Sequence, residues 1–137
     1  MLGPLRVAPL YRTTPVSPIP QPDYLNTAAV GTAALPPCEL LALAKRLERE
    51  AGRAAGGPHD APRPLDVDLL VYGEACEELD CGEGGRLVLP HPRMTERAFV
   101  LVPLAEVAPE LRVPPEGRTV AELLAGLGEV TGVTRLP

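Results

Sequence analysis

The amino-acid sequence predicts an α+β fold in which helices pack on a mainly antiparallel sheet. The expected elements follow in the order strand, strand, helix, strand, short strand, helix, helix, without the regular alternation of parallel α/β sheets. At 137 residues the chain is also long enough for a hydrophobic core of its own. We therefore expect a single domain over residues 1–137, with helices flanking the sheet as in a sandwich.

The first half of the chain is expected to form two strands and a helix. Residues 5–13 indicate a strand that enters a proline-rich loop, and residues 24–33 a strand of small and β-branched residues. Two prolines open a helix over about 36–51, and Gly52 is expected to end it. Its apolar positions predict a buried stripe at Leu40, Ala44, Leu47 and Ala51.

The middle of the chain is expected to return to strands. Glycines and prolines predict a flexible loop over 53–63. An apolar strand over 65–72 follows, then an acidic turn over 73–85 that reads as a solvated hairpin tip. Residues 86–92 add a short strand and a rigid bend.

Two helices complete the predicted fold. Residues 95–111 combine helical spacing with Pro103, so we expect a short helix followed by irregular chain. Residues 119–128 begin with a capping-box pattern, in which Glu122 stands three residues after Thr119, and end at a glycine. This segment is therefore predicted to be a capped helix.

The composition argues against several classes of protein. No apolar run approaches the length of about 18 residues that a membrane span requires. The first residues lack the apolar core and cleavage site of a signal peptide, so we expect a cytoplasmic protein. The net charge of −5 argues against general nucleic-acid binding. Cys38, Cys76 and Cys81 do not stand at zinc spacing, so we expect reduced thiols.

Two aspartates stand one residue apart at the head of the apolar segment 65–72. In a strand, Asp66 and Asp68 project to the same face, roughly 7 Å apart along the backbone. Two unpaired carboxylates would repel each other, and a divalent cation relieves that repulsion. Mg²⁺ commonly binds to one or two carboxylates together with substrate phosphates and waters. The pair therefore indicates a magnesium site, although Asp-x-Asp also occurs by chance on surface strands.

Basic residues suggest a phosphate-binding cluster. Arg93 and Arg97 lie four apart, so on a helical turn they share a face. With Arg53 and Arg63 they could bind phosphate, because guanidinium groups match phosphate oxygens bidentately. His91 is held between two prolines, which fixes its backbone. The alternative is that these are ordinary surface arginines and a loop histidine.

Aromatic residues are rare, with three Tyr, one Phe and no Trp. Tyr24 and Phe99 could fill the core, or they could enclose a flat heteroaromatic ligand between two rings. Asn26 would then bind the polar edge of that ligand.

Three blocks of the sequence resemble the hydroxymethyl-dihydropterin pyrophosphokinase (HPPK) family of folate biosynthesis. They are residues 11–26, 63–73 and 89–111, which stand in the family's order with similar spacing. The most specific parts are an Arg-x-Leu-Asp-x-Asp block and a Pro-His-x-x-Met-x-x-Arg-x-Phe block, and the resemblance extends from Leu5 to about Gly117. It implies a ferredoxin-like α/β sandwich that transfers the β,γ-pyrophosphate of ATP to the pterin hydroxymethyl group and releases AMP.

The resemblance also implies roles for individual residues. Asp66 and Asp68 would hold two Mg²⁺ ions, and the other residues would bind the pterin or ATP. Catalysis is assigned to Arg53, Arg63, Asp66 and Asp68; pterin binding to Thr13, Thr14, Val16, Tyr24, Asn26 and Phe99; nucleotide binding to Lys45, Glu48, Arg63, Arg86, His91 and Arg97. The partners are then small-molecule substrates, without nucleic acid or membrane, and we expect a monomer or weak homodimer.

The chain departs from the family pattern in several places, including Lys45 for a usual Gln and Pro92 for a frequent Tyr. The strand, turn and helix with which the family begins, about thirty residues, are expected to be missing. Ala55 and Asp60 also stand where the family has Arg and Trp. Two alternatives therefore remain beside the enzyme. One is a shortened protein that binds pterin or nucleotide without efficient turnover, and the other is an interaction domain whose Asp pair binds a structural cation.

Overall fold

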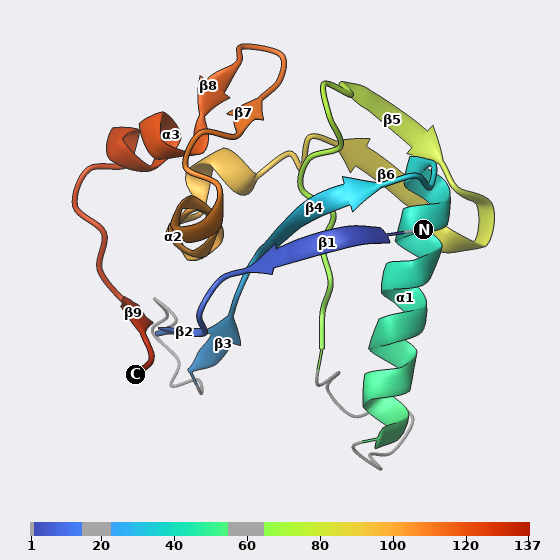
Figure 1. Ribbon diagram of the computed structural model, residues 1–137, viewed down its shortest axis with the longest axis horizontal. Coiled ribbons are helices and arrows are strands. Elements are labelled where there is room, and N and C mark those ends of the chain that lie inside the picture. The colour runs from blue at the N-terminus through green and yellow to red at the C-terminus, as the bar shows by residue number, and fades with distance from the viewer. Residues whose placement is uncertain (1, 15–22, 55–64) are drawn as a thin grey trace. The chain divides into compact units, whose positions relative to one another are not determined.

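The computed structural model describes residues 2–14, 23–54 and 65–137, which belong to two compact units. Unit 1 spans residues 33–91, and unit 2 combines residues 2–32 with 92–137. Both units contain helices and antiparallel strand pairs, which confirms the predicted α+β class (Figure 1). None of the helices in this described part has the length and apolar character that a membrane crossing needs.

Unit 2 contains a three-stranded sheet and two further strand pairs. Its strands are β1 (Leu2–Val7), β2 (Tyr11–Thr13), β3 (Tyr24–Asn26), β4 (Ala29–Ala33), β7 (Arg112–Val113), β8 (Arg118–Thr119) and β9 (Val133–Arg135). β2 lies between β3 and β9 and pairs antiparallel with both. β1 pairs with β4, and β7 pairs antiparallel with β8. The patterns in the sequence do not predict β9 or the β7–β8 hairpin.

The strands predicted over 5–13 and 24–33 are each broken in two, which corrects the prediction. A proline lies at the first break, where it has no N–H for a strand ladder. The Ala8 N–H donates to the carbonyl oxygen of Ala28 at 2.8 Å, and the Thr27 hydroxyl donates to the carbonyl oxygen of Ala8 at 2.9 Å. The two breaks therefore lie opposite each other and are joined by hydrogen bonds.

Two helices of unit 2, α2 (Ala98–Val107) and α3 (Val120–Gly126), pack against each other. The prediction that Pro103 ends the first of them is wrong, because α2 continues through it. Pro103 is buried together with Leu101 and Leu104. This apolar burial offsets the loss of the backbone hydrogen bond that proline cannot donate.

The ends of these helices follow local signals. The 3₁₀ helix η2 (Met94–Glu96) precedes α2. At the start of α3, Thr119 Oγ1 accepts a hydrogen bond from the Glu122 N–H at 3.1 Å, and Glu122 Oε1 accepts one from the Thr119 N–H at 3.0 Å. The predicted capping box is thereby confirmed.

Unit 1 is described as one helix and one strand hairpin. The helix is α1 (Pro37–Ala54), and the hairpin pairs β5 (Glu77–Asp80) antiparallel with β6 (Arg86–Leu89) through the 3₁₀ turn η1 (Gly82–Gly84). Figure 1 shows the hairpin beside the N-terminal end of α1. The acidic turn predicted over 73–85 is wrong in part, because residues 77–80 of it form β5 and only the residues after β5 make the hairpin turn. The predicted end of α1 is also wrong, because the helix continues beyond Gly52.

A disulfide joins α1 to the hairpin. Cys38, in the first turn of α1, is bonded to Cys81, which follows β5. The prediction of reduced thiols is wrong for this pair, because folding brings the two Cα atoms to 5.2 Å, a distance that a disulfide spans. Cys76 keeps a free, exposed thiol.

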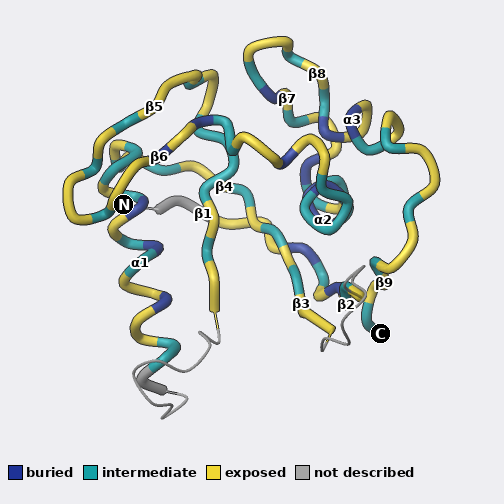
Figure 2. Tube along the Cα trace, turned by 180° about the vertical axis from the view of Figure 1, so that it is seen from behind, coloured by how far each residue is buried: buried dark blue, intermediate teal, exposed yellow. Residues whose placement is uncertain are grey.

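The buried face of α1 differs from the predicted stripe at two positions, where Leu41 is buried in place of Leu40 and Glu48 in place of Leu47. Leu41, Ala44 and Glu48 are buried, whereas Leu47 is 43% exposed. Figure 2 shows that buried and exposed positions recur along α1. Leu41 packs with Leu87 of the hairpin in the core of unit 1. The face keeps the helical spacing of three and four residues, but one of its members is a carboxylate, which an apolar pattern overlooks.

The strand predicted over 65–72 is not formed. These residues have no regular secondary structure, although Leu69 and Tyr72 pack against the core of unit 1. The Tyr72 hydroxyl also donates to the carbonyl oxygen of Leu35 at 2.5 Å. The segment is thus held by side-chain contacts and isolated hydrogen bonds, whereas a strand requires a ladder of backbone bonds to a neighbour.

Candidate active site

The aspartate pair lies on an exposed part of unit 1. Asp66 and Asp68 are both exposed, and Val67 between them is half-buried. Within the described residues no hydrogen bond or ion pair holds either carboxylate. Both carboxylates are therefore accessible to a ligand from solvent.

Glu48 is hydrogen-bonded to the backbone between these two aspartates. Its side chain is 5% exposed, and its Oε2 accepts a hydrogen bond of 2.7 Å from the Val67 N–H. Lys45, one helical turn earlier on α1, places its Nζ 3.9 Å from Glu48 Oε1. Lys45 and Glu48, which are both predicted to bind the nucleotide, thus contact each other, and Glu48 contacts the backbone between the aspartates.

His91 is joined to the same segment through its backbone. The His91 N–H donates to the carbonyl oxygen of Leu70 at 2.7 Å, and the side chain is half-buried. Arg86, also predicted to bind nucleotide, lies exposed on β6 and forms an ion pair with Glu78 of β5. The structure therefore brings His91 to the aspartate segment and gives Arg86 a partner on the hairpin.

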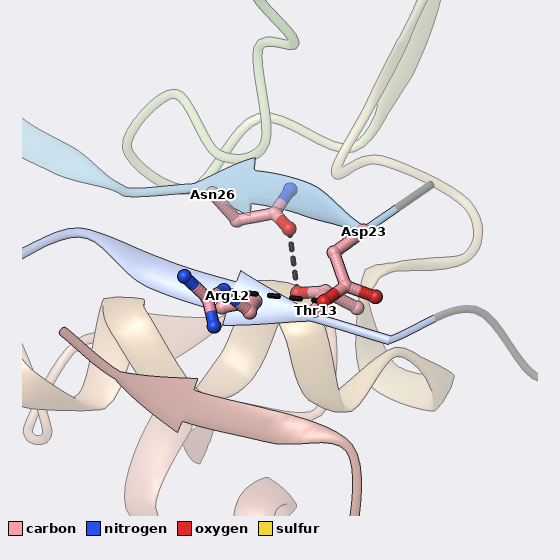
Figure 3. A network of polar contacts seen from close by, with 4 residues as sticks. All are labelled: Arg12, Thr13, Asp23 and Asn26. Carbon is pink, nitrogen blue, oxygen red and sulfur yellow. Dashed lines mark hydrogen bonds and ion pairs between the residues drawn. The ribbon is translucent and has the colours of Figure 1, made fainter. Parts of the chain in front are cut away.

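The predicted pterin-binding residues of β2 and β3 lie together in unit 2. Thr13 stands directly opposite Tyr24 in the antiparallel register. The Thr13 hydroxyl donates to Asn26 Oδ1 at 2.6 Å, and the Arg12 guanidinium lies 3.9 Å from an oxygen of Asp23, the residue before β3 (Figure 3).

The hydrogen bond from Thr13 to Asn26 leaves the N–H groups of the Asn26 amide available at the site. Because Asn26 Oδ1 is engaged by Thr13, the amide nitrogen presents two N–H donors that no group in the described chain accepts. Tyr24 is 53% exposed, so part of its ring can contact a ligand. The Thr14 N–H already donates to the carbonyl oxygen of Gly132 at 2.8 Å, so this donor is engaged within the protein.

A second pair of predicted site residues stands at the start of α2. Arg97 is the N-cap residue of this helix, and its guanidinium carbon lies 5.5 Å from the centre of the Phe99 ring. Both side chains are half-buried. This is cation–π geometry, which orients the aromatic face and the charge together. α2 also packs against β2 and β3.

The sheet is joined to α2 by residues that the sequence patterns do not single out. The Tyr11 hydroxyl donates to Glu106 Oε1 at 2.8 Å, and the same oxygen lies 3.5 Å from Nη1 of Arg135. Burial is the main cause that raises the pKa of the Tyr11 phenol, and Glu106 adds to it. Tyr11 and Arg135 are opposite each other in the β2–β9 register, which no local pattern could reveal.

Three predicted site residues cannot be placed. Val16 and Arg63 lie outside the described residues, as does the side chain of Arg53. The remaining predicted residues form two groups. Lys45, Glu48, Asp66, Asp68, Arg86 and His91 belong to unit 1, and Thr13, Thr14, Tyr24, Asn26, Arg97 and Phe99 belong to unit 2.

The described side chains contain no group of three or more His, Cys, Asp or Glu residues arranged to hold a metal. Asp66 and Asp68 can therefore supply only part of a coordination shell. This donor set fits Mg²⁺, which typically takes one or two carboxylates and completes its octahedron with phosphate oxygens and water.

Most of the chain matches the model of one known protein family. The model described as 7,8-dihydro-6-hydroxymethylpterin-pyrophosphokinase (HPPK) matches residues 2–109. The chain belongs to this family. The matched range includes every residue predicted for the site, and it confirms the resemblance seen in the sequence blocks.

Named relatives support the same assignment. The 2-amino-4-hydroxy-6-hydroxymethyldihydropteridine pyrophosphokinase of Pseudomonas aeruginosa is 42% identical over 96% of this chain and 76% of its own length. A protein of that name from Synechocystis is 41% identical, over 87% of this chain and 57% of its own length. A folate synthesis bifunctional protein of Arabidopsis thaliana is 44% identical over 72% of this chain, which spans only 19% of that relative.

Proposed function

We propose that this chain is an ATP-dependent pyrophosphokinase that acts on 6-hydroxymethyl-7,8-dihydropterin in folate biosynthesis. The hydroxymethyl oxygen bonds to the β-phosphorus of ATP, the bond from that phosphorus to the α,β-bridging oxygen breaks, and AMP leaves. The hydroxyl proton passes to water. The observation that carries the proposal is the similarity to a pyrophosphokinase at 42% identity over 96% of the chain.

Asp66 and Asp68 are proposed to hold Mg²⁺, with two ions in the complete site. Both carboxylates are exposed and have no partner in the described chain, so both can serve as ligands. When bound, Mg²⁺ neutralises charge on the triphosphate and orients its oxygens. The protein's contribution is to carry both carboxylates, two residues apart, on one short exposed segment.

Residues of unit 2 are proposed to recognise the pterin. Tyr24 and Phe99 supply aromatic faces for stacking, and Asn26 supplies two N–H donors for the polar edge of the ring. Thr13 fixes the orientation of that amide through its hydroxyl. The proposed contact between Thr14 and the pterin is made by the carbonyl or the side chain of Thr14, because its N–H donates to Gly132.

Basic residues are proposed to bind the phosphates of ATP. Transfer of this kind requires mainly alignment and charge neutralisation, which guanidinium and imidazole groups provide. The proposed phosphate contacts are Arg53, Arg63, Arg86, His91 and Arg97, with Lys45 nearer the nucleoside. A cytoplasmic location and a monomer or weak homodimer belong to the same proposal.

The test is AMP formation from ATP at millimolar Mg²⁺, with and without the hydroxymethyl pterin. We expect AMP only when the pterin is present. The matched control substrate carries a methyl group in place of the hydroxymethyl group, so it can stack and pair but has no oxygen to accept the pyrophosphate.

Folded protein that forms no pterin-dependent AMP overturns the proposal. Binding of the pterin in the same sample then indicates the alternative, a binding protein without efficient turnover. AMP formed equally with the methyl control would show that water, and not the pterin, accepts the pyrophosphate.

A further inference from the structure

The positions of the Asp66 and Asp68 carboxylates depend on the backbone that carries them. Neither side chain is held by another group in the described chain, and both are exposed. The segment 65–72 also has no strand ladder to define its path. Whatever fixes the backbone of this segment therefore determines how close the two carboxylates can be held to a common cation.

The anchor nearest to the pair is the bond between Glu48 and Val67. Val67 stands between the two aspartates, and its N–H donates to Glu48 Oε2 at 2.7 Å. The other anchors, at Leu70 and Tyr72, lie further along the segment. Glu48 is rigidly placed, because it lies in the middle of α1 and is 5% exposed.

Burying the charged Glu48 side chain costs free energy, so we infer that this side chain has a function. A buried charge requires a hydrogen bond or an opposite charge, and here the Val67 N–H and the Lys45 ammonium provide them. Glu48 forms no group of three potential metal ligands with the aspartates in the described chain. Its geometry thus fits support of the segment better than direct metal binding.

We propose that Glu48 is a positioning residue, which holds the Val67 backbone so that Asp66 and Asp68 can share a divalent cation. The proposal rests on the proposed function for the assignment of Asp66 and Asp68 as cation ligands. Cation binding at the aspartate segment can be measured without ATP, pterin or turnover, so the two proposals can fail separately.

Two variants separate the hydrogen bond from the charge. Glu48→Gln keeps an oxygen that can accept from the Val67 N–H but removes the charge. Glu48→Leu has a similar size, fills the buried position and accepts no hydrogen bond. Glu50→Leu is the matched control, because Glu50 is on the same helix, is 54% exposed and pairs with Arg46 at 3.4 Å, on the helix surface.

Two NMR measurements on the free protein test the proposal. The first is hydrogen exchange of the Val67 amide, normalised to the Ala44 amide of α1, so that a general loss of stability is removed from the comparison. The second is a titration with Mn²⁺ alone, which binds carboxylates as Mg²⁺ does and broadens nearby amide signals. The amides of residues 66–69 report the site.

We expect Glu48→Leu to speed Val67 exchange on the order of tenfold and to raise the Mn²⁺ concentration for half-broadening on the order of tenfold, as loss of a charge-assisted hydrogen bond predicts. Glu48→Gln and Glu50→Leu should stay within about threefold of the unaltered protein in both measurements.

Three results would overturn the proposal. If Glu48→Gln loses as much Mn²⁺ affinity as Glu48→Leu, the charge matters and the hydrogen bond does not. If Glu48→Leu keeps the Val67 amide exchange rate and the Mn²⁺ affinity of the unaltered protein, the bond does not position the segment. If Mn²⁺ fails to broaden residues 66–69 in the unaltered protein, the segment is not a cation site.

Discussion

The Thr13 hydroxyl donates a hydrogen bond of 2.6 Å to Asn26 Oδ1, from β2 to β3. This bond fixes which end of the Asn26 amide is engaged within the protein and which end faces away from Thr13 (Figure 3). The two N–H groups of Asn26 are therefore available for an acceptor on a ligand. The relation between the two residues determines the hydrogen-bonding character of the proposed pterin site.

The first prediction concerns this amide. Asn26→Asp replaces two donors with an acceptor, so pterin binding should weaken by about 10- to 100-fold, the effect of leaving a polar group of the ligand unpaired. Thr13→Val should weaken it less, because the amide loses its orientation but keeps its donors. Fluorescence titration with the pterin measures both. Thr134→Val on β9 is the control, since Thr134 is exposed, and equal weakening there would contradict the prediction.

A second prediction concerns the aspartate pair. Asp66→Asn removes a charged ligand from the proposed magnesium site, and the rate of AMP formation should fall on the order of 100-fold at fixed Mg²⁺. Part of that loss should return at higher Mg²⁺ concentration. The exposed Glu74 supplies the control Glu74→Gln, which removes a nearby charge from the same unit. An unchanged rate of AMP formation in Asp66→Asn would show that Asp66 does not belong to the site.

A third prediction follows from the hydrogen bond between Tyr11 and Glu106. Tyr11→Phe removes the donor and leaves Glu106 with Arg135 alone, so the free energy of unfolding should fall by about 1–2 kcal/mol. Urea unfolding at neutral pH measures this change. A variant as stable as the unaltered protein would show that Arg135 satisfies the carboxylate without Tyr11.

The same residue predicts a dependence on pH. The folded state raises the pKa of Tyr11 above its usual value of about 10, so the protonated phenol is favoured by folding. This contribution to stability is present below the unfolded pKa and is lost as the pH rises through the folded pKa. Urea unfolding between about pH 9 and 11 should therefore show a decline that is smaller in Tyr11→Phe. Equal declines in both proteins would contradict the assignment.

The disulfide provides a fifth prediction. Cys38 and Cys81 are 43 residues apart in the sequence, so their bond closes a long loop and restricts the unfolded chain. Replacing both with serine should lower the free energy of unfolding by about 2–4 kcal/mol. Urea unfolding under oxidising conditions measures the loss, and mass spectrometry identifies the linked peptides. Cys76→Ser should change little, because this thiol is exposed and free. A linkage through Cys76 would contradict the pairing.

The sequence by itself determined the features that depend on near neighbours. The capping box of Thr119 and Glu122 is an interaction between residues three apart, and it forms as predicted. The α+β class followed from the order of local patterns. The blocks around Asp66 and Phe99 identified the family, because their residue types and spacing are specific whatever the path of the chain between them.

Tertiary structure decided the features that depend on partners far away in the sequence. Pro103 stays within a helix because its ring is buried, and residues 65–72 form no strand. Cys38 meets Cys81, and Glu48 meets Val67, only after α1 folds against its neighbours. The physical reason is the same in each case. Local spacing shows which side chains share a face, but whether a charge or a proline can be buried, and whether two cysteines can bond, depends on what lies opposite.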